Sequence, residues 1–387
     1  MKEIYFDNSA TTPLLPEARE AALRVLDTIY GNPSSLHSIG LAAEKEISAA
    51  RNAVLSALGS DKTKGRLIFC GCGSEASNIA IMGSARAKKH RGTPKLIITD
   101  SEHPATENQA RALENDGWEV VRIATRGGVL DMAMLEATLD ERTAIVSLML
   151  VNNETGAVYD VPAAFKLARK KAPQALLHCD AIQGFLKIPF TARSLGADAI
   201  SLSAHKIGGM KGVGALWYSP ETEKARRLSP VILGGGQENG LRSGTENTAG
   251  IASFGAAAEK NRANASANAQ KCAVLTESII NALKDVPEIS FNLPPVRAPH
   301  ILSITNSRVR SETLVHFLSA KGIFVSAGSA CSSHDKRTSS ALAAFGLTDA
   351  AAGKTIRISV SPDYTVDDAL YFCEAFKEGV LTLAGEK

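Results

Sequence analysis

The sequence predicts an α/β protein in which helices cover a mostly parallel β-sheet. Short, almost continuous apolar segments alternate along the chain with longer segments that have the apolar periodicity of helices. Strands that are buried on both faces of a parallel sheet have this apolar composition. Hydrophobic residues make up 44% and charged residues 21% of the 387 residues, which is typical of a globular protein and excludes a disordered or fibrous one.

The predicted elements follow in order along the chain. A helix is expected over residues 41–58, because Ile47, Val54 and Leu55 fall on one apolar stripe and Gly59 ends it. The strand-like segments of the same region are residues 66–70, 95–99, 145–151, 175–179 and 199–203.

The pattern changes after about residue 255. A long helical segment, 256–283, is followed by short apolar runs at residues 300–305, 322–326 and 355–360. Two further helical segments lie between or after these runs, at residues 311–320 and 365–383. Thr365 is the expected N-cap of the last helix, with Asp368 at its third position. We therefore expect a large domain over residues 15–255 and a smaller α+β domain formed by residues 1–14 and 256–387.

Charge and cysteine usage exclude several classes of protein. The 43 Lys and Arg residues are dispersed and nearly balanced by 40 Asp and Glu residues, so a nucleic-acid partner is not expected. We find no signal peptide and no apolar stretch near the roughly 20 residues of a membrane span. The six cysteines are therefore expected to be reduced thiols of a cytoplasmic protein. Cys70 and Cys72 have no second ligand pair, so no metal site is predicted.

Two polar side chains follow predicted strands. Lys206 comes directly after the 199–203 run and His205, and a lysine in such a place can form a Schiff base if its surroundings lower its pKa. Asp180 follows the 175–179 run, 26 residues before Lys206, which fits one strand–helix–strand step. Pyridoxal 5'-phosphate (PLP) requires such a carboxylate and lysine. An exposed strand-end lysine and a helix-capping aspartate are the alternatives.

Two glycine-rich segments suit a phosphate group. Gly73 and Ser74 lie where the 66–70 strand leads into a helix, and a helix N-terminus offers free N–H groups to an anion. Turns of this kind are common before helices, so this signal alone is weak. Residues 234–247 contain Arg242 and Thr245 and are expected to contribute to the same anion site, with a flexible turn as the alternative.

Cys331 lies in a run of small residues, 326–334, that has no apolar periodicity and is typical of an exposed loop. The nearby His334 and Lys336 favour the thiolate, which makes Cys331 a candidate nucleophile. An incidental surface thiol is the alternative.

Together these motifs resemble the cysteine desulfurases (NifS/IscS-like), a group of the class V aminotransferase family of fold-type I PLP enzymes. The resemblance runs nearly end to end and is carried by residues 5–12, 31–37, 102–104, 152–156, 178–183, 205–206, 234–247, 328–333 and 356–357. The chain departs from the family pattern after the first glycine-rich turn, where Ser74 keeps the hydroxyl of a usual Thr and Ser77 replaces an acidic residue.

The resemblance implies a fold and a role for each matched residue. A large PLP-binding domain with a mostly parallel central sheet flanked by helices would be joined to the small domain, which carries the catalytic cysteine loop at about residues 326–340. Lys206 would bind the cofactor covalently and Asp180 would pair with its ring nitrogen. The further cofactor contacts would come from Gly73, Ser74, His103 stacked on the ring, Gln183, Ser203, His205 and, across a homodimer interface, Thr245. The substrate carboxylate would bind to Asn153 and Arg357.

The activity implied by the resemblance is the conversion of L-cysteine to L-alanine, with Lys206, Cys331 and His103 as catalytic residues. Sulfur would remain on Cys331 as a persulfide and pass to an acceptor protein, either an iron–sulfur scaffold or a carrier for tRNA or cofactor thiolation. The alternatives are a selenocysteine lyase, a cysteine sulfinate desulfinase or another class V PLP enzyme, and a catalytically silent scaffold for sulfur carriers.

Overall fold

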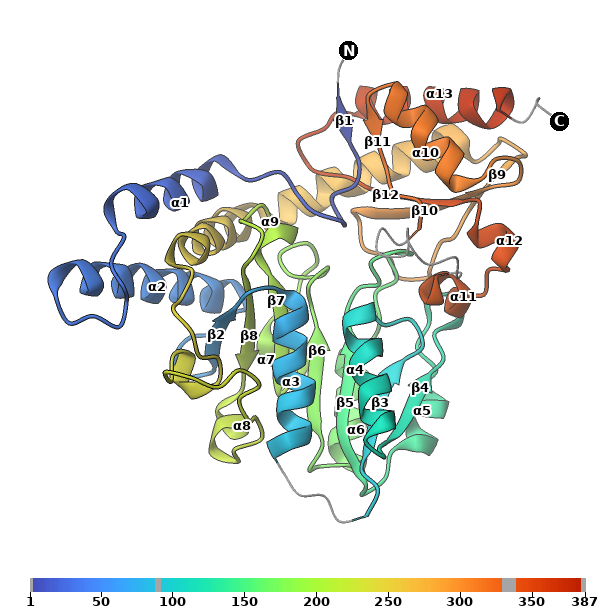
Figure 1. Cartoon of the computed structure of the whole chain (residues 1–387). Coiled ribbons are helices and arrows are strands. Elements are labelled where there is room, and N and C mark those ends of the chain that lie inside the picture. The colour runs from blue at the N-terminus through green and yellow to red at the C-terminus, as the bar shows by residue number, and fades with distance from the viewer. Residues whose placement is uncertain (1–2, 88–91, 329–338, 384–387) are drawn as a thin grey trace.

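A seven-stranded sheet forms the centre of the larger part of the molecule in the computed structural model, which describes residues 3–87, 92–328 and 339–383 (Figure 1). Its strand order is β2-β8-β7-β6-β5-β3-β4. The strands are β2 (Arg66–Cys70), β3 (Lys95–Thr99), β4 (Glu119–Ile123), β5 (Thr143–Met149), β6 (Leu176–Asp180), β7 (Ala199–Ser203) and β8 (Gly214–Tyr218). Strand β8 is antiparallel to both neighbours, and the other pairs are parallel. The predicted mostly parallel sheet is therefore confirmed.

The five predicted strands of this region all occur in the sheet, within two residues of their expected ends. Strands β4 and β8 lie outside the predicted runs. Strand β4 forms one edge of the sheet, and four of its five residues are only partly buried. An edge strand with charged residues such as Glu119 and Arg122 lacks the continuous apolar pattern by which a central strand is predicted.

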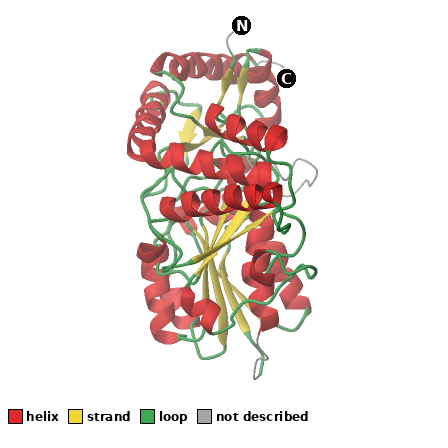
Figure 2. Ribbon diagram, turned by 90° about the vertical axis from the view of Figure 1, so that its left-hand side faces the viewer, coloured by secondary structure: helices red, strands yellow, loops and turns green. Residues whose placement is uncertain are grey.

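Helices lie on both sides of this sheet, as Figure 2 shows. They are α1 (Pro16–Thr28), α2 (Ser38–Ala57), α3 (Gly73–Ala87), α4 (Pro104–Asn115), α5 (Met132–Thr138), α6 (Val161–Lys171), α7 (Ala192–Leu195) and α8 (Pro220–Lys224). The described part of the chain also contains three short 3₁₀ helices, namely η1 (Arg126–Gly128), η2 (Ala204–Lys206) and η3 (Glu238–Gly240). Within the described residues, no helix is both long and apolar enough to cross a membrane.

The smaller part contains a three-stranded antiparallel sheet and a parallel pair of strands. The sheet is formed by β9 (Ile289–Phe291), β10 (Ile301–Asn306) and β12 (Thr355–Ser359), and the pair by β1 (Ile4–Tyr5) and β11 (Ile323–Phe324). Its helices are α10 (Ser311–Ala320), α11 (Ser340–Phe345), α12 (Asp349–Ala352) and α13 (Val366–Thr382). Thr365 and Asp368 form the predicted capping box of α13.

Helix α9 (Thr248–Leu283) connects the two parts and packs against α1, α2 and α13. Its N-terminal half, with Phe254, belongs to the larger cluster of buried residues, and its C-terminal half, with Leu275, to the second one. Ile4 and Phe6 also belong to the second cluster, which supports adding residues 1–14 to a small domain. The expected boundary at residue 255 falls inside this continuous helix, so the division into two domains remains a proposal.

Candidate active site

Two adjacent strands bring the predicted lysine and carboxylate to the same edge of the sheet. Strand β6 ends with Asp180, and β7 leads directly into η2, whose last residue is Lys206. The two strands run parallel, with Asp180 opposite Ser201 in the register. Because the carboxyl ends of parallel strands meet at one edge, Asp180 and Lys206 emerge where α/β sheets bind their ligands.

The N-terminal segment, residues 7–12, lies against this edge and binds several site residues. The Lys206 amine donates hydrogen bonds to the carbonyl oxygens of Ser9 and Ala10, at 2.6 and 2.8 Å. The Gln183 amide also donates to the Ser9 carbonyl, at 2.9 Å. The segment thus holds Lys206 and Gln183 within hydrogen-bonding distance of the same backbone oxygen.

Arg357 approaches the same segment from the smaller part of the molecule. Its side chain is 3% exposed, and one terminal nitrogen is 2.7 Å from the Asp7 carboxylate. The other terminal nitrogen donates to the backbone carbonyl of Asn153 at 3.0 Å, so the recorded contact does not use the Asn153 amide group. The buried Nε of Arg357 has no hydrogen-bond partner within the described residues. One terminal nitrogen of the guanidinium that was expected to bind a substrate carboxylate is therefore already paired with Asp7.

The first turn of α3 approaches strand β7 closely, and the groups at this place, here called the anion cradle, could hold an anion. A side chain at Gly73 would collide with Ile182 and lie 3.3 Å from the Cβ of Ser203. Ser203 is 2% exposed, and its hydroxyl has no partner among the described residues. Ser74 is exposed in the first turn of α3, where backbone N–H groups have no acceptor within the helix. This donor set fits the phosphate of PLP.

His205 lies beside this cradle and is fixed by the N-terminal segment. Its Nδ1 is 3.2 Å from the Thr11 hydroxyl, and its backbone carbonyl accepts from the Thr12 hydroxyl at 2.9 Å. Burial and, to a smaller extent, the nearby Lys206 charge lower the pKa of His205 to about 4. His205 is therefore neutral at neutral pH.

The carboxylate and the imidazole predicted to contact the cofactor ring are both largely buried. Burial raises the pKa of Asp180 to about 6, while the backbone N–H of Ile182 and the Lys206 charge stabilise the carboxylate. His103 is the N-cap of α4, and its Nδ1 accepts a hydrogen bond from Ala105 at 3.1 Å. Burial and the Lys206 charge lower the pKa of His103 to about 4. At neutral pH His103 is therefore neutral and carries its proton on Nε2.

Other buried polar residues have no role assigned from the sequence. His178 lies two residues before Asp180 in β6. Its two ring nitrogens contact the hydroxyls of Ser147 and Ser201, both at 2.8 Å. Ser77 of α3 donates to Ser201 at 3.2 Å, so this network joins three central strands to the helix of the anion cradle. The sequence signal that could have revealed this network is a histidine inside an otherwise apolar strand segment.

Two glutamates also lie at the site, inside motifs quoted for the resemblance. Glu102 is 3% exposed and precedes His103. Glu154 is 5% exposed and accepts a hydrogen bond from the Ser339 hydroxyl at 2.5 Å. Burial raises the pKa of Glu154, whereas Ser339 and the charge of Arg357 lower it.

Within the described residues, no recorded contact joins Thr245 to the other predicted site residues. Thr245 is exposed in the glycine-rich segment. In the same segment Arg242 is paired with Glu75 of α3 at 2.8 Å, so its guanidinium is engaged by a carboxylate rather than free for an anion. Cys331 lies outside the described residues.

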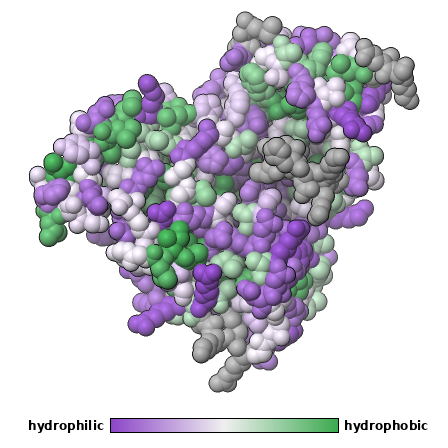
Figure 3. Space-filling model, in the orientation of Figure 1, coloured by the Kyte–Doolittle hydropathy of each residue, from purple (hydrophilic) through white to green (hydrophobic). Residues whose placement is uncertain are grey.

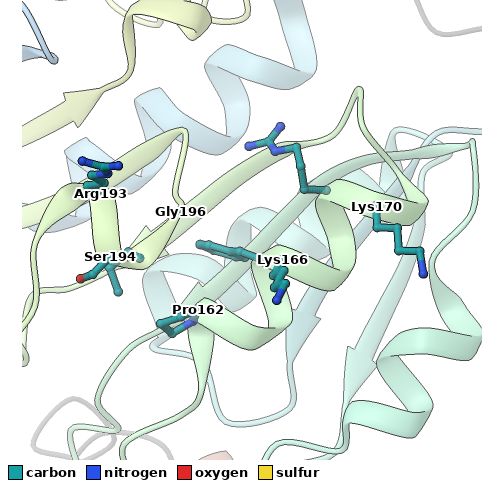
Figure 4. Close-up of a pocket in the computed structure, with 9 residues that line it drawn as sticks. Pro162, Lys166, Lys170, Arg193, Ser194 and Gly196 are labelled. Atoms are coloured by element: carbon teal, nitrogen blue, oxygen red, sulfur yellow. The ribbon is translucent and has the colours of Figure 1, made fainter.

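An open groove between α6 and α7 is lined by Pro162, Lys166, Lys170, Arg193, Ser194 and Gly196, among others (Figure 4). Its volume is about 590 Å³. Arg169 in its wall is paired with Asp198 at 2.8 Å. None of the predicted site residues lines this groove, which is therefore separate from the candidate active site.

Comparisons with known proteins point to one family. The family model "Aminotransferase class-V" matches residues 4–372. A "NifS/IcsS protein homolog" of Lactobacillus delbrueckii subsp. bulgaricus is 38% identical over 97% of this chain and 96% of its own length. A "Cysteine desulfurase IscS" of Pectobacterium carotovorum is 35% identical over 97% of this chain and 92% of its own length.

Solved structures share the whole fold. A "NIFS-LIKE PROTEIN" superposes with a TM-score of 0.90 at 32% identity and covers 99% of this chain and 100% of its own. A structure titled "SspA in complex with cysteine" has a TM-score of 0.80 at 28% identity and covers 94% of this chain and 100% of its own. These structures confirm the expected fold class.

Proposed function

The chain belongs to the class V aminotransferase family, and on that premise we propose that it is a PLP-dependent cysteine desulfurase. The observation that carries the proposal is the meeting of Lys206 and Asp180 at the ends of adjacent parallel strands, beside the first turn of α3. Relatives that are named cysteine desulfurases and match almost the full length support the choice of reaction.

The residues at the sheet edge fit the proposed cofactor. The orphaned hydroxyl of Ser203 and the first turn of α3 would bind its phosphate, together with Gly73, Ser74 and His205. Asp180 would hold a proton on the ring nitrogen, Gln183 would bind the ring hydroxyl, and Lys206 would bind the aldehyde. When bound, PLP supplies an electron sink for the bonds around the amino acid's Cα.

The chain's own groups would then bind the substrate and move its protons. Arg357 would bind the α-carboxylate of L-cysteine, with Asn153 beside it, either through its unpartnered Nε or by displacing Asp7. Lys206 would remove the proton from Cα, and the neutral His103 would cover the ring. The Cys331 thiolate would take the sulfur atom, so that L-cysteine and the thiol give L-alanine and a persulfide on Cys331.

Two variants test the assignment. Cys331→Ser should keep the absorption band of bound PLP and lose alanine formation from cysteine, whereas Lys206→Ala should lose the covalent band itself. Lys260→Ala, on an exposed part of α9, is the control and should retain both. Full turnover in Cys331→Ser would refute the sulfur-acceptor role and favour a selenocysteine lyase or another class V PLP enzyme. A protein that does not bind PLP would favour the silent scaffold.

A homodimer is supported by apolar side chains on the face formed by α1, α2 and the glycine-rich segment. Leu36 is 91%, Tyr30 76% and Leu233 81% exposed. Green patches on this side of the molecule are visible in Figure 3. We propose that a second copy covers this face, so that the exposed Thr245 reaches the partner's cofactor phosphate. A cytoplasmic location and transfer of the sulfur to an iron–sulfur scaffold or a thiolation carrier complete the proposal.

A further inference from the structure

Glu102 closes a gap between two strands of the central sheet. The register of β3 with β5 ends at Ile97 and Val146, so Thr99 and Met149, the last residues of the two strands, are not paired with each other. One Glu102 oxygen, Oε1, accepts from the Thr99 hydroxyl at 2.8 Å and from the backbone N–H of Met149 at 2.9 Å. The side chain therefore replaces the missing strand contact and fixes the turn that carries the next residue, His103.

The surroundings of Glu102 disfavour a negative charge. The residue is 3% exposed, and no lysine, arginine or histidine of the described ranges forms an ion pair with it. Among the described residues, the titratable groups recorded as interacting with its charge are Asp180, Cys179 and Tyr159, and none of these is a cation. A buried carboxylate without a counter-charge is costly, and protonation removes that cost.

The second oxygen of the carboxyl group shows what the protonated form offers. Oε2 is buried and has no partner among the described residues. In the acid form this atom carries the proton and is a hydrogen-bond donor at the sheet edge where Asp180 also ends its strand. Met149 is directly opposite Asp180 in the register of β5 and β6, so the two carboxyl groups lie on neighbouring strands of one edge.

We propose that Glu102 is a positioning residue that stays a neutral carboxylic acid at neutral pH and holds the His103 turn against the sheet beside Asp180. Of the two neighbouring carboxyl groups, Asp180 is then the one that carries the negative charge. Burial raises the pKa of Glu102 to about 8, whereas that of Asp180 reaches only about 6, because the backbone N–H of Ile182 and the Lys206 charge stabilise the Asp180 carboxylate. The consequence for cofactor binding rests on the proposed function, but the charge state of Glu102 does not.

The charge state can be measured directly by infrared difference spectroscopy. The spectrum of the wild-type protein minus that of Glu102→Gln at pH 7 should contain the carbonyl band of a protonated carboxylic acid. Glu114→Gln is the matched control, because Glu114 is exposed on α4 and the hydrogen bond from Arg122 lowers its pKa. That control should remove carboxylate bands only. Carboxylate bands in the Glu102 difference spectrum at pH 7 would overturn the proposal.

Stability against pH gives a second measurement on the cofactor-free protein. The pKa of Glu102 is higher in the folded chain than its ordinary value of 4.5, so its proton stabilises the fold at low pH and this contribution is lost as pH rises to about 8. The thermal midpoint of the wild type should therefore fall relative to Glu102→Gln between pH 5 and 8. Parallel curves for the two proteins would contradict a protonated Glu102.

The positioning role is tested by titrating the cofactor-free variants with PLP. Glu102→Gln keeps a neutral side chain with an acceptor oxygen and should bind PLP within about twofold of the wild type. Glu102→Ala frees the Met149 N–H and the His103 turn and should bind PLP at least about tenfold more weakly. Equal loss in both variants, or no loss in Glu102→Ala, would overturn the positioning role. Failure of every protein to bind PLP would refute the proposed function and leave the infrared result standing.

Discussion

Replacing Gly214 by alanine should displace the anion cradle without removing any side chain that is proposed to bind the cofactor. Gly214 begins β8, opposite Cys70 of β2 and Ser203 of β7. An alanine Cβ at this position would lie 2.5 Å from the carbonyl oxygen of Cys72 and 2.8 Å from the backbone nitrogen of Gly73. These are backbone atoms of the turn before α3, so no side chain can rotate away to relieve the clash.

The size of the effect follows from these distances. An ordinary Cβ contact is about 3.4 Å, so the turn must withdraw by about 1 Å to relieve the closest contact, which is with the carbonyl carbon of Cys72. A phosphate hydrogen bond of about 2.9 Å would then lengthen to about 3.9 Å, beyond the usual limit. Loss of one such charged hydrogen bond costs about 1.5–3 kcal/mol, which weakens PLP binding roughly 10- to 100-fold. Overpacking should also destabilise the fold by about 1–3 kcal/mol.

The assay is a PLP titration of the cofactor-free protein, with thermal unfolding of the same sample. Gly353→Ala is the matched control, because Gly353 has right-handed helical φ/ψ angles and its added Cβ would make only ordinary contacts of 3.4 Å or more. We expect the control to bind PLP as the wild type does. If Gly214→Ala binds PLP within about twofold of the wild type and unfolds at the same temperature, the close approach does not position the cradle.

Two further predictions concern the Asp7–Arg357 pair and the exposed face that contains Leu36. Asp7→Asn should lower the thermal midpoint, because it removes the charge that faces the buried Arg357 guanidinium, and the expected loss of stability is about 1–3 kcal/mol. An unchanged midpoint would show that the pair adds no stability. Leu36→Asp should give the mass of a monomer in light scattering, because it places a charge on the exposed face that the second copy would cover. The variant should also bind PLP more weakly, since Thr245 is proposed to act across the interface. A mass equal to that of the wild type would argue against a dimer through this face.

Local pattern predicts those features of this protein that depend on neighbouring residues. The apolar runs locate five central strands, and the spacing of Asp180 and Lys206 predicts their common edge because one strand–helix–strand step has a nearly fixed geometry. The cap of α13 is likewise a local motif. The half-exposed strand β4 has no comparable signal.

Contacts between distant segments are not visible in such patterns. Arg357 binds Asp7 across 350 residues of sequence, and the Lys206 amine binds the Ser9 carbonyl across 197. The proposed protonation of Glu102 is also not visible in the local sequence, because it depends on the side chains that surround Glu102 in the fold. The roles of Thr245 and Cys331 remain predictions from the resemblance.

The attachment of residues 7–12 to the sheet edge also dictates the order in which this protein can mature. The ribosome makes this segment well before its partners, which arise at Lys206 and, later, at Arg357 in β12. The segment can therefore dock on Lys206 only after η2 has emerged, and on Arg357 only after β12 has emerged. Shortened products of interrupted translation that lack β12 should therefore leave the Asp7 carboxylate without its guanidinium partner, even where their main sheet is intact.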